Sequence, residues 1–205
     1  MTEKNSNRAF TLTGFFIALM LSSSVSGDEL SAKAVVEKFQ GDLIDVMKNG
    51  QVLGFSGRVD KLTGPVSESH DLPGVARIVV GEEWEKLTSD QQQQLIAVFS
   101  EFSIASYAHN FTEYTGETFT FNSEEEIARG GMVIHSRLNL PDDKPVKFDY
   151  MLKKEDDNWL IVNIIADGVS DLALKRSEYT TILQREGFDS LISKIKGKIV
   201  QYSKS

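Results

Sequence analysis

The spacing of apolar residues predicts helices over the first half of the folded chain. From residue 31 to about residue 112, apolar positions recur every three or four residues, as they do in amphipathic helices. Ser31 is a candidate N-cap, and Thr88 with Gln91 has the spacing of a capping box. The predicted helices are 31–48, a looser one over 52–70 that Gly64-Pro65 interrupts, a short one from Pro73 through Val79, and 89–112.

The helix predicted over 89–112 is apolar on two sides. At about 100° of rotation per residue, two apolar sets fall on roughly opposite faces: Leu95, Val98, Phe99 and Phe102 on one, and Ile96, Ile104, Tyr107 and Phe111 on the other. A helix at the surface of a domain carries one apolar stripe, so a second stripe indicates burial on both sides. We therefore expect this helix to lie between two layers.

The period of the apolar positions changes to two after Gly116, which is typical of β-strands. Four strands are predicted, one around Phe119 and Phe121 and the others over about 132–140, 146–152 and 159–166. Their short polar connections favour an antiparallel meander. The fourth strand is apolar at both parities, so we expect it to be central or covered on both faces.

Two further helices, over about 171–186 and 188–202, follow the strands, with Gly187 between them. The order of elements predicts an α+β domain in which a four-stranded antiparallel sheet is covered by N- and C-terminal helices. Aromatic residues gather in the longest helix and in the sheet. Such a set usually fills a core, but a curved sheet closed by helices, in a nuclear-transport-factor-like or cystatin-like arrangement, also encloses an apolar cavity. The pattern leaves both outcomes open.

The first thirty residues have the three-part order of a secretory signal peptide. Lys4 and Arg8 precede a mainly apolar run over 10–21, which small residues follow. This run is shorter than the roughly 20 residues that a membrane-spanning helix needs. We predict a signal peptide over 1–27, and one exported domain over 28–205. An uncleaved N-terminal anchor is the alternative.

Composition and charge exclude several classes of function. The 205-residue chain has no cysteine, which excludes disulfides, thiolate nucleophiles, and zinc or iron–sulfur sites built on cysteine. A net charge of −8 disfavours a nucleic-acid partner, because the phosphate backbone would repel the protein. Residues 171–205 nevertheless hold seven basic and four acidic residues. They form either a solvated pair of amphipathic helices or a basic face for anionic lipids or an acidic partner.

No motif of a catalytic or cofactor site occurs in the sequence. His70, His109 and His135 lack metal-ligand spacing, so a surface or structural role is favoured for each, and His135 is expected to face solvent. There is no nucleophile elbow and no phosphate-binding loop. Three carboxylate runs, at 124–126, 142–143 and 155–157, fall in predicted turns and lack the order of a calcium loop. The sequence therefore shows no recognisable catalytic site, and we predict no cofactor and no metal.

A series of short segments over about residues 33–200 carries a family resemblance. They include Leu53-Gly-Phe, Arg58-Val-Asp-Lys-Leu62, Trp84-Glu-Lys-Leu87, Tyr114-Thr-Gly-Glu117, Trp159-Leu-Ile-Val-Asn163 and Arg176-Ser-Glu-Tyr179. In this order and spacing they resemble the MlaC-type periplasmic lipid-binding proteins, also called toluene-tolerance auxiliary components of ABC transport systems. The first and last of these segments look most like the hopanoid-associated subgroup, HpnM. Asn163 stands where the family commonly has Asp.

The resemblance implies a soluble carrier that is not an enzyme. It would hold a phospholipid or a hopanoid in a cavity between sheet and helices, touch membranes transiently, and exchange its cargo with a membrane-bound ABC permease complex. We predict a pocket with the hydroxyls of Tyr107 and Tyr150 at its mouth, lined by Phe99, Phe102, Tyr107, Phe111, Met132, Ile134, Phe148, Tyr150, Trp159, Ile161, Val169 and Leu172. Two alternatives stay open: a periplasmic enzyme with a titratable pair in the same cavity, and an envelope interaction module with a packed core.

Overall fold

Four helices open the part of the chain that the computed structural model describes, which is Met1 and residues 30–204. They are α1 (Ala32–Lys48), α2 (Gly50–Ser69), α3 (Leu72–Val80) and α4 (Ser89–Asn110), with the 3₁₀ segment η1 (Gly81–Lys86) between the last two. Both predicted caps are confirmed. Ser31 accepts a hydrogen bond from the Ala34 N–H at 3.1 Å, and Thr88 and Gln91 form a capping box. Apart from Met1, the signal peptide predicted over 1–27 falls outside the described residues.

The break in α2 lies at Gly54 and not at Gly64-Pro65, where the sequence predicted it. Gly54 has φ 59° and ψ −175°, a combination that glycine adopts far more readily than other residues. Pro65 stays inside the helix, although it lacks an N–H donor and its ring crowds the carbonyl one turn earlier. The helix therefore continues through Pro65 to its end at Ser69.

The strands form one antiparallel meander, as predicted, but with five strands instead of four. They are β1 (Thr118–Ile127), β2 (Gly131–Asn139), β3 (Val146–Glu155), β4 (Asn158–Ala166) and β5 (Val169–Ser170), in that order across the sheet, and the turn η2 (Ala128–Gly130) joins the first two. β5 has two residues, too few to show a period in the sequence. The prediction of a turn at 124–126 is wrong, because these glutamates pair with β2.

Strand β4 changes the parity of its inward-facing residues at a bulge. Before the bulge Ile161 pairs with Leu152 of β3, and after it Ile164 pairs with Tyr150. Leu152 and Tyr150 point to the same face because they are two residues apart, so Ile161 and Ile164 share that face although they are three residues apart. The bulge explains why this strand is apolar at both parities.

The junction between α2 and α3 closes one edge of β4. His70 forms a parallel bridge with Ile161, and the Asp71 N–H donates to the Ile161 carbonyl at 3.0 Å. The Asp71 carboxylate then caps α3 by accepting from the Gly74 N–H at 2.9 Å, and it is ion-paired with Lys153 at 2.7 Å. Strand β4 therefore has partners on both edges, β3 on one and the short β5 with the helix junction on the other, as expected for a central strand.

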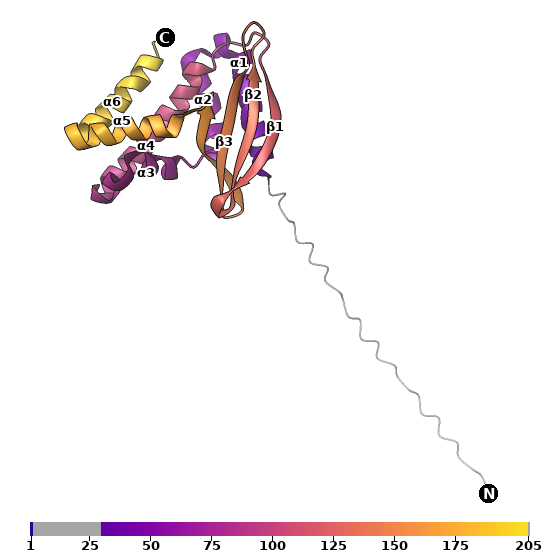
Figure 1. Ribbon diagram of the computed structural model, residues 1–205, viewed down its shortest axis with the longest axis horizontal. Coiled ribbons are helices and arrows are strands. Elements are labelled where there is room, and N and C mark those ends of the chain that lie inside the picture. The colour runs from indigo at the N-terminus through magenta and orange to yellow at the C-terminus, as the bar shows by residue number, and fades with distance from the viewer. Residues whose placement is uncertain (2–29, 205) are drawn as a thin grey trace.

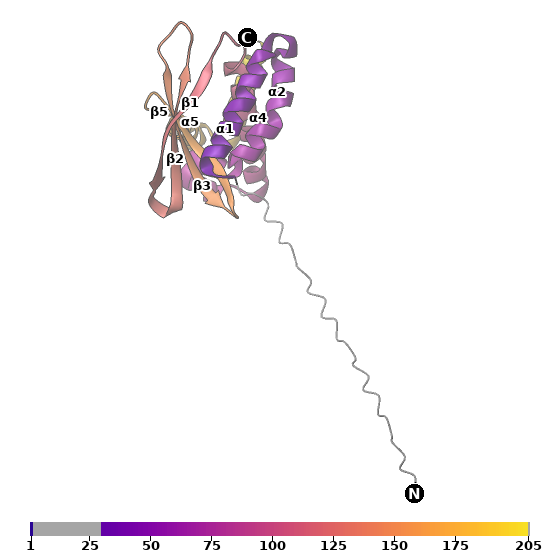
Figure 2. The same cartoon turned by 90° about the vertical axis from the view of Figure 1, so that its right-hand side faces the viewer.

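The helices gather on one face of the sheet. Figure 1 shows the strands β1–β3 on one side of the molecule, and Figure 2 shows α1, α2 and α4 together on the same side of the sheet. Helix α1 packs on β1, β2 and β4, whereas α4 packs on α2, α3 and α6 (Phe188–Tyr202). Helix α5 (Asp171–Glu186) covers α3 and β4. The burial of α4 on more than one side, which its two apolar faces predicted, is confirmed.

The uncovered face of the sheet carries a polar cluster. His135 of β2 lies opposite Asp149 of β3, and its Nδ1 is 2.7 Å from Asp149 Oδ1. Glu125 of β1 adds a carboxylate oxygen 3.7 Å from the other ring nitrogen. Their neighbours Ile134 and Tyr150 point to the opposite, buried face. The prediction that His135 points away from the core is therefore confirmed.

A buried arginine joins α2 to the end of α4. The Arg58 guanidinium donates from Nε to the Ala108 carbonyl at 2.7 Å and from Nη1 to the Gly50 carbonyl at 3.0 Å. Burial lowers the pKa of Arg58, because the charged form loses hydration. The same region is packed so closely that a Cβ on Gly50 would lie 1.7 Å from the Thr112 carbonyl oxygen. These contacts fix α4 to its neighbouring helix.

Two glycine substitutions test the joint between α2 and α4. Gly50→Ala forces the Thr112 backbone to move, so we expect the free energy of unfolding to fall by about 2 kcal/mol. Gly41→Ala is the matched control in α1, where a Cβ meets nothing within 4 Å. It should raise the free energy of unfolding by about 0.5–1 kcal/mol, because alanine is the better helix former. Urea unfolding measures both, and equal stabilities would show that the joint is loosely packed.

Candidate functional site

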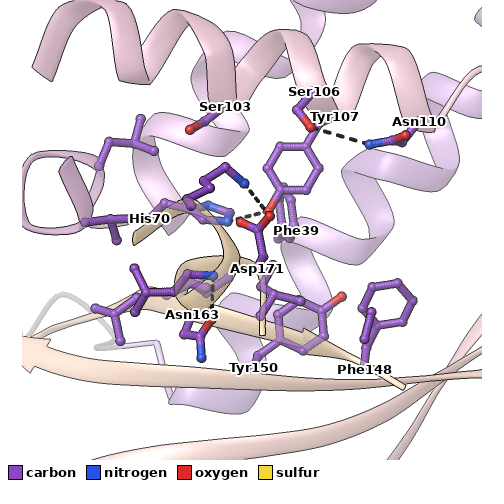
Figure 3. Close-up of a pocket in the computed structure, with 18 of the residues that line it drawn as sticks. Phe39, His70, Ser103, Ser106, Tyr107, Asn110, Phe148, Tyr150, Asn163 and Asp171 are labelled. Atoms are coloured by element: carbon purple, nitrogen blue, oxygen red, sulfur yellow. Dashed lines mark hydrogen bonds and ion pairs between the residues drawn. The ribbon is translucent and has the colours of Figure 1, made fainter. Parts of the chain in front are cut away.

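A pocket of about 390 Å³ lies between α4 and the inner face of β3 and β4. In Figure 3, Ser103, Ser106, Tyr107 and Asn110 come from α4, and Phe148, Tyr150 and Asn163 come from the sheet facing it. The other wall residues are Phe39 and Leu43 of α1, His70, Leu72 and Val75 near the α2–α3 junction, Phe99 and Phe111 of the α4 region, Ile161, Val162, Ile164 and Ala166 of β4, and Val169, Asp171, Leu172, Leu174 and Lys175 at β5 and the start of α5.

The pocket has a buried floor and an exposed rim. Phe39, Tyr150 and Ile161 are each 1% exposed, whereas Val169 and Leu174 are 53% and 60% exposed. The mouth therefore lies at β5 and the first turns of α5. If one methylene takes about the volume of a water molecule, about 30 Å³, the pocket holds about a dozen methylenes.

Asn163 positions the start of α5 at this mouth. Its Oδ1 accepts hydrogen bonds from the Leu172 N–H at 3.2 Å and from the Ser170 hydroxyl at 3.1 Å. Ser170 in turn caps α5 by accepting from the Ala173 N–H at 3.1 Å. A neutral amide thus satisfies donors at the start of the helix without bringing a charge into the pocket wall.

A directional chain of hydrogen bonds holds His70 in the pocket wall. The Ser69 hydroxyl donates to the Pro65 carbonyl at 2.6 Å, so Ser69 Oγ is left to accept from His70 Nδ1, 2.9 Å away. The neutral ring then has its lone pair on Nε2, which accepts from the Tyr107 hydroxyl at 2.8 Å (Figure 3). Both ring nitrogens are therefore engaged by neighbouring side chains.

Burial keeps this part of the wall uncharged. The His70 ring meets Phe39 and Tyr107 edge-on, at centroid distances of 4.9 and 5.5 Å. Burial lowers the pKa of His70 to about 4, and the Val66 carbonyl opposes this shift only in part. Burial also raises the pKa values of Tyr107 and Tyr150. All three groups are neutral at physiological pH.

The two tyrosine hydroxyls lie inside the pocket, and the prediction that they mark its mouth is wrong. Tyr107 is hydrogen-bonded to His70. Tyr150 is 1% exposed and interacts with the side chain of Gln40, which donates to Ser136 Oγ at 2.9 Å. Polar groups that point inward here need hydrogen-bond partners inside the protein. Both hydroxyls therefore have a structural role in the pocket wall.

The structure brings eight of the twelve predicted lining residues together in the wall: Phe99, Tyr107, Phe111, Phe148, Tyr150, Ile161, Val169 and Leu172. The other four lie outside it. Phe102 stacks on Tyr202 of α6 at 5.9 Å, Ile134 belongs to the packed core, and Met132 and Trp159 pack against that core. Lipid binding by the eight wall residues stays a prediction.

Sequence reasoning missed the polar wall residues His70, Ser103, Ser106, Asn110, Asn163, Asp171 and Lys175. Three of them, Ser103, Ser106 and Asn110, follow one another on α4 at intervals of three and four residues, so the periodicity of that helix could have found them. His70 and Lys175 had no comparable signal. His70 reaches the pocket because α2 ends at the edge of β4. Lys175 reaches it because α5 starts at the mouth of the pocket.

One ion pair brings formal charge to the described pocket wall. Asp171 and Lys175 lie one turn apart on α5 and are in direct contact. Within the described residues, no three His, Asp or Glu side chains converge as metal ligands would. An apolar floor below a polar rim suits an amphiphile, whose hydrocarbon and polar parts need different surroundings.

The sequence matches the profile of the MlaC protein family over residues 37–197, most of the chain. The chain belongs to the MlaC family. One relative is the intermembrane phospholipid transport system binding protein MlaC of Haemophilus influenzae, which is 24% identical over 123 residues. The match covers 58% of this MlaC-family chain and 57% of that relative, so it spans little more than half of either protein.

The fold of this MlaC-family chain is shared with a phospholipid-binding protein from Ralstonia solanacearum, whose structure was solved in complex with a phospholipid. The TM-score is 0.71 at 22% sequence identity, over 85% of this chain and 99% of the Ralstonia chain. The likeness establishes the shared α+β fold. Among the helices of residues 30–204, none combines the length and apolar character needed to cross a membrane.

The neutral state of His70 predicts that this MlaC-family fold loses stability in acid. The unfolded chain takes up a proton at His70 near pH 6.5, and the folded protein does so only near pH 4. Between these values the unfolded state binds more protons, so stability is lost as the pH falls through this window, by about 3 kcal/mol for this group.

Urea unfolding of the wild type and of His70→Gln at pH 7 and pH 4 isolates this effect. We subtract the free energy of unfolding of the wild type from that of the variant at each pH. This difference should be about 3 kcal/mol larger at pH 4 than at pH 7. The glutamine cannot take up the proton, which makes it the matched reference. A difference that is the same at both pH values would mean that His70 is hydrated in the folded protein.

Proposed function

We propose that this chain is a phospholipid carrier of the bacterial envelope. The observation that carries the proposal is the pocket, which has an uncharged apolar floor and opens at a rim with exposed apolar and charged side chains. A phospholipid fits it with hydrocarbon inside and the headgroup outside. Membership of the MlaC family and the phospholipid bound by the Ralstonia protein support the proposal.

The volume of the pocket determines how much free energy a hydrocarbon chain gains when it leaves water and enters the pocket. About a dozen methylenes fit, and each contributes about 0.8 kcal/mol when it leaves water, so a bound chain gains about 10 kcal/mol gross. A bilayer offers the same methylenes a similar gain. Transfer between bilayer and protein is therefore close to balanced, and the carrier can both load and unload.

The pocket takes one acyl chain of a diacyl lipid. The second chain lies along the rim, where Val169 and Leu174 expose apolar side chains. This arrangement leaves the headgroup beside the exposed Asn110 and Asp171. The same exposed rim makes the transient contact with a membrane during loading.

The lipid passes between this carrier and a membrane-bound partner. The sequence has no phosphate-binding loop for a nucleotide, so the direction of transport comes from the partner, which we propose is an ABC permease complex. Residues 1–27, as an export signal, would place the domain in the periplasm, between two membranes. The Haemophilus relative, named as the binding protein of an intermembrane phospholipid transport system, supports this arrangement.

A hopanoid is the alternative cargo. Its support is the likeness of Leu53-Gly-Phe and Arg176-Ser-Glu-Tyr179 to the hopanoid-associated subgroup. A polycyclic lipid interacts less with the charged rim than a phospholipid does, and this favours the phospholipid. Lipid that co-purifies with the protein from its native host, identified by mass spectrometry, decides between the two.

The pocket contains the shielded histidine that an enzyme would need, but its hydrogen bonds disfavour catalysis. Both nitrogens of His70 are engaged, and the Ser69 hydroxyl donates to a backbone carbonyl, so no free base stands beside a nucleophile. With a pKa of about 4, the ring is a weak base at neutral pH. We therefore propose a binding role without enzymatic activity.

Filling part of the pocket should weaken loading. Ser103 lies in the wall on α4, and its hydroxyl donates to the Phe99 carbonyl of the same helix at 2.9 Å. Ser103→Trp puts an indole into the space without removing the partner of another side chain. If the indole displaces two methylenes, affinity falls by about 1.6 kcal/mol, which is more than tenfold. Native mass spectrometry after incubation with phospholipid vesicles measures the loaded fraction.

Gln94→Trp is the control for this experiment. Gln94 is exposed on the same helix and lies outside the pocket wall, so the variant should load as the wild type does. Circular dichroism confirms that both variants are folded. If Ser103→Trp loads as much lipid as the wild type, the pocket is not the lipid-binding site. A wild type that carries no lipid from its host and takes none from vesicles would overturn the carrier function.

A further inference from the structure

An ion pair at the rim of the pocket combines a shielded cation with an exposed anion. Asp171 and Lys175 are in contact on the first turns of α5, and both line the pocket. The Lys175 side chain is 14% exposed, whereas the Asp171 side chain is 61% exposed. Lysine is among the residues least often buried, so the position of Lys175 points to a role inside the rim.

Two neighbours hold the Lys175 ammonium on the inner side of the rim. Its Nζ lies 5.5 Å from the centre of the Phe102 ring, whose face attracts a cation. Its other partner is the Asp171 carboxylate, which Figure 3 shows pointing into the pocket toward Tyr107. Because solvent reaches the exposed Asp171 carboxylate, its pairing with Lys175 contributes little net stability, and Asp171 can turn toward another cation. The ammonium can then meet a second anion.

We propose that Asp171 and Lys175 form a headgroup subsite for zwitterionic phospholipids, which carry an ammonium next to the phosphodiester. Lys175 binds the phosphodiester and Asp171 binds the ammonium, so the headgroup dipole lies antiparallel to the dipole of the ion pair. This inference rests on the proposed function, because it assumes that a bound phospholipid places its acyl chain on the floor and its headgroup at the rim.

The charges at the rim favour a zwitterionic headgroup over an anionic one. Among the described wall residues, Lys175 supplies one positive charge and Asp171 one negative charge, and His70 is neutral. The headgroup of phosphatidylglycerol would satisfy Lys175 but leave Asp171 facing a second negative charge. An ammonium removes this repulsion and replaces Lys175 as the partner of Asp171. Discrimination thus includes a repulsive element against the wrong lipid.

Other basic residues on α5 and α6 form ion pairs outside the pocket. Lys194 pairs with Glu186 at 2.5 Å, and Lys198 pairs with Glu178 at 2.7 Å. Neither lysine belongs to the pocket wall. Of the basic residues in the C-terminal segment, Lys175 is therefore the one whose position suits a lipid phosphate in the pocket.

Competition between two lipids in one vesicle tests the subsite. Lipid-free protein is incubated with vesicles of equal parts phosphatidylethanolamine and phosphatidylglycerol with the same acyl chains, and native mass spectrometry counts the two loaded species. The wild type should prefer phosphatidylethanolamine by about fivefold, equivalent to about 1 kcal/mol. Asp171→Asn removes the partner of the ammonium and should lower this ratio to about one. Lys175→Met should reduce the loading of both lipids by about fivefold.

Two control variants separate the subsite from general effects of charge. Glu178→Gln removes the same charge from α5 at a position outside the pocket wall, and it should keep the wild-type ratio. Lys194→Met removes a cation from α6 outside the pocket wall and should keep the wild-type loading of both lipids. Equal loading of both lipids by the wild type, or an unchanged ratio in Asp171→Asn, would overturn the subsite and leave the carrier function standing. Failure of the wild type to load either lipid would overturn both.

Discussion

The way α4 is held determines the rest of the structure. Helix α1 lies directly on the strands and is fixed there by the buried hydrogen bond from Gln40 to Ser136, whereas α4 packs on other helices and is joined to α2 by Arg58. Helix α1 thereby acts as a spacer that keeps α4 away from β3 and β4, and the space between them is the pocket. A core packed to ordinary density would close this space and leave no room for hydrocarbon.

An unfilled apolar space is costly, and this cost links stability to function. At about 24 cal/mol per Å³ for an internal cavity, 390 Å³ costs at most about 9 kcal/mol. That cost is close to the gross gain from burying about a dozen methylenes. A bound acyl chain therefore offsets the free energy that the empty pocket costs. Because the lipid binds the folded state, it also stabilises the fold by mass action. The neutral His70, Tyr107 and Asn163 keep the wall compatible with hydrocarbon while their own hydrogen bonds are satisfied.

Local signals in the sequence predicted the helices well, because neighbouring residues such as Ser31 and Thr88 determine where a helix starts. Distant contacts decided what was missed: the bulge in β4, the short β5, and the arrival of His70 at the strand edge. The same division holds for the site. Inward parity and helix faces predicted the apolar wall, but they do not tell which part of an inward face meets another side chain, as Phe102 does, and which part meets the pocket.

The central claim is that one acyl chain lies on the floor of this pocket. A phospholipid with a photoactivatable diazirine at the end of one acyl chain tests it most directly, when it is loaded from vesicles, activated by light and located by peptide mass spectrometry. The cross-links should fall on floor residues from two elements, namely Phe39 and Leu43 of α1 and Ile161 of β4. Cross-links on the outer sheet face around His135 and Asp149, or none in the pocket wall, would contradict it.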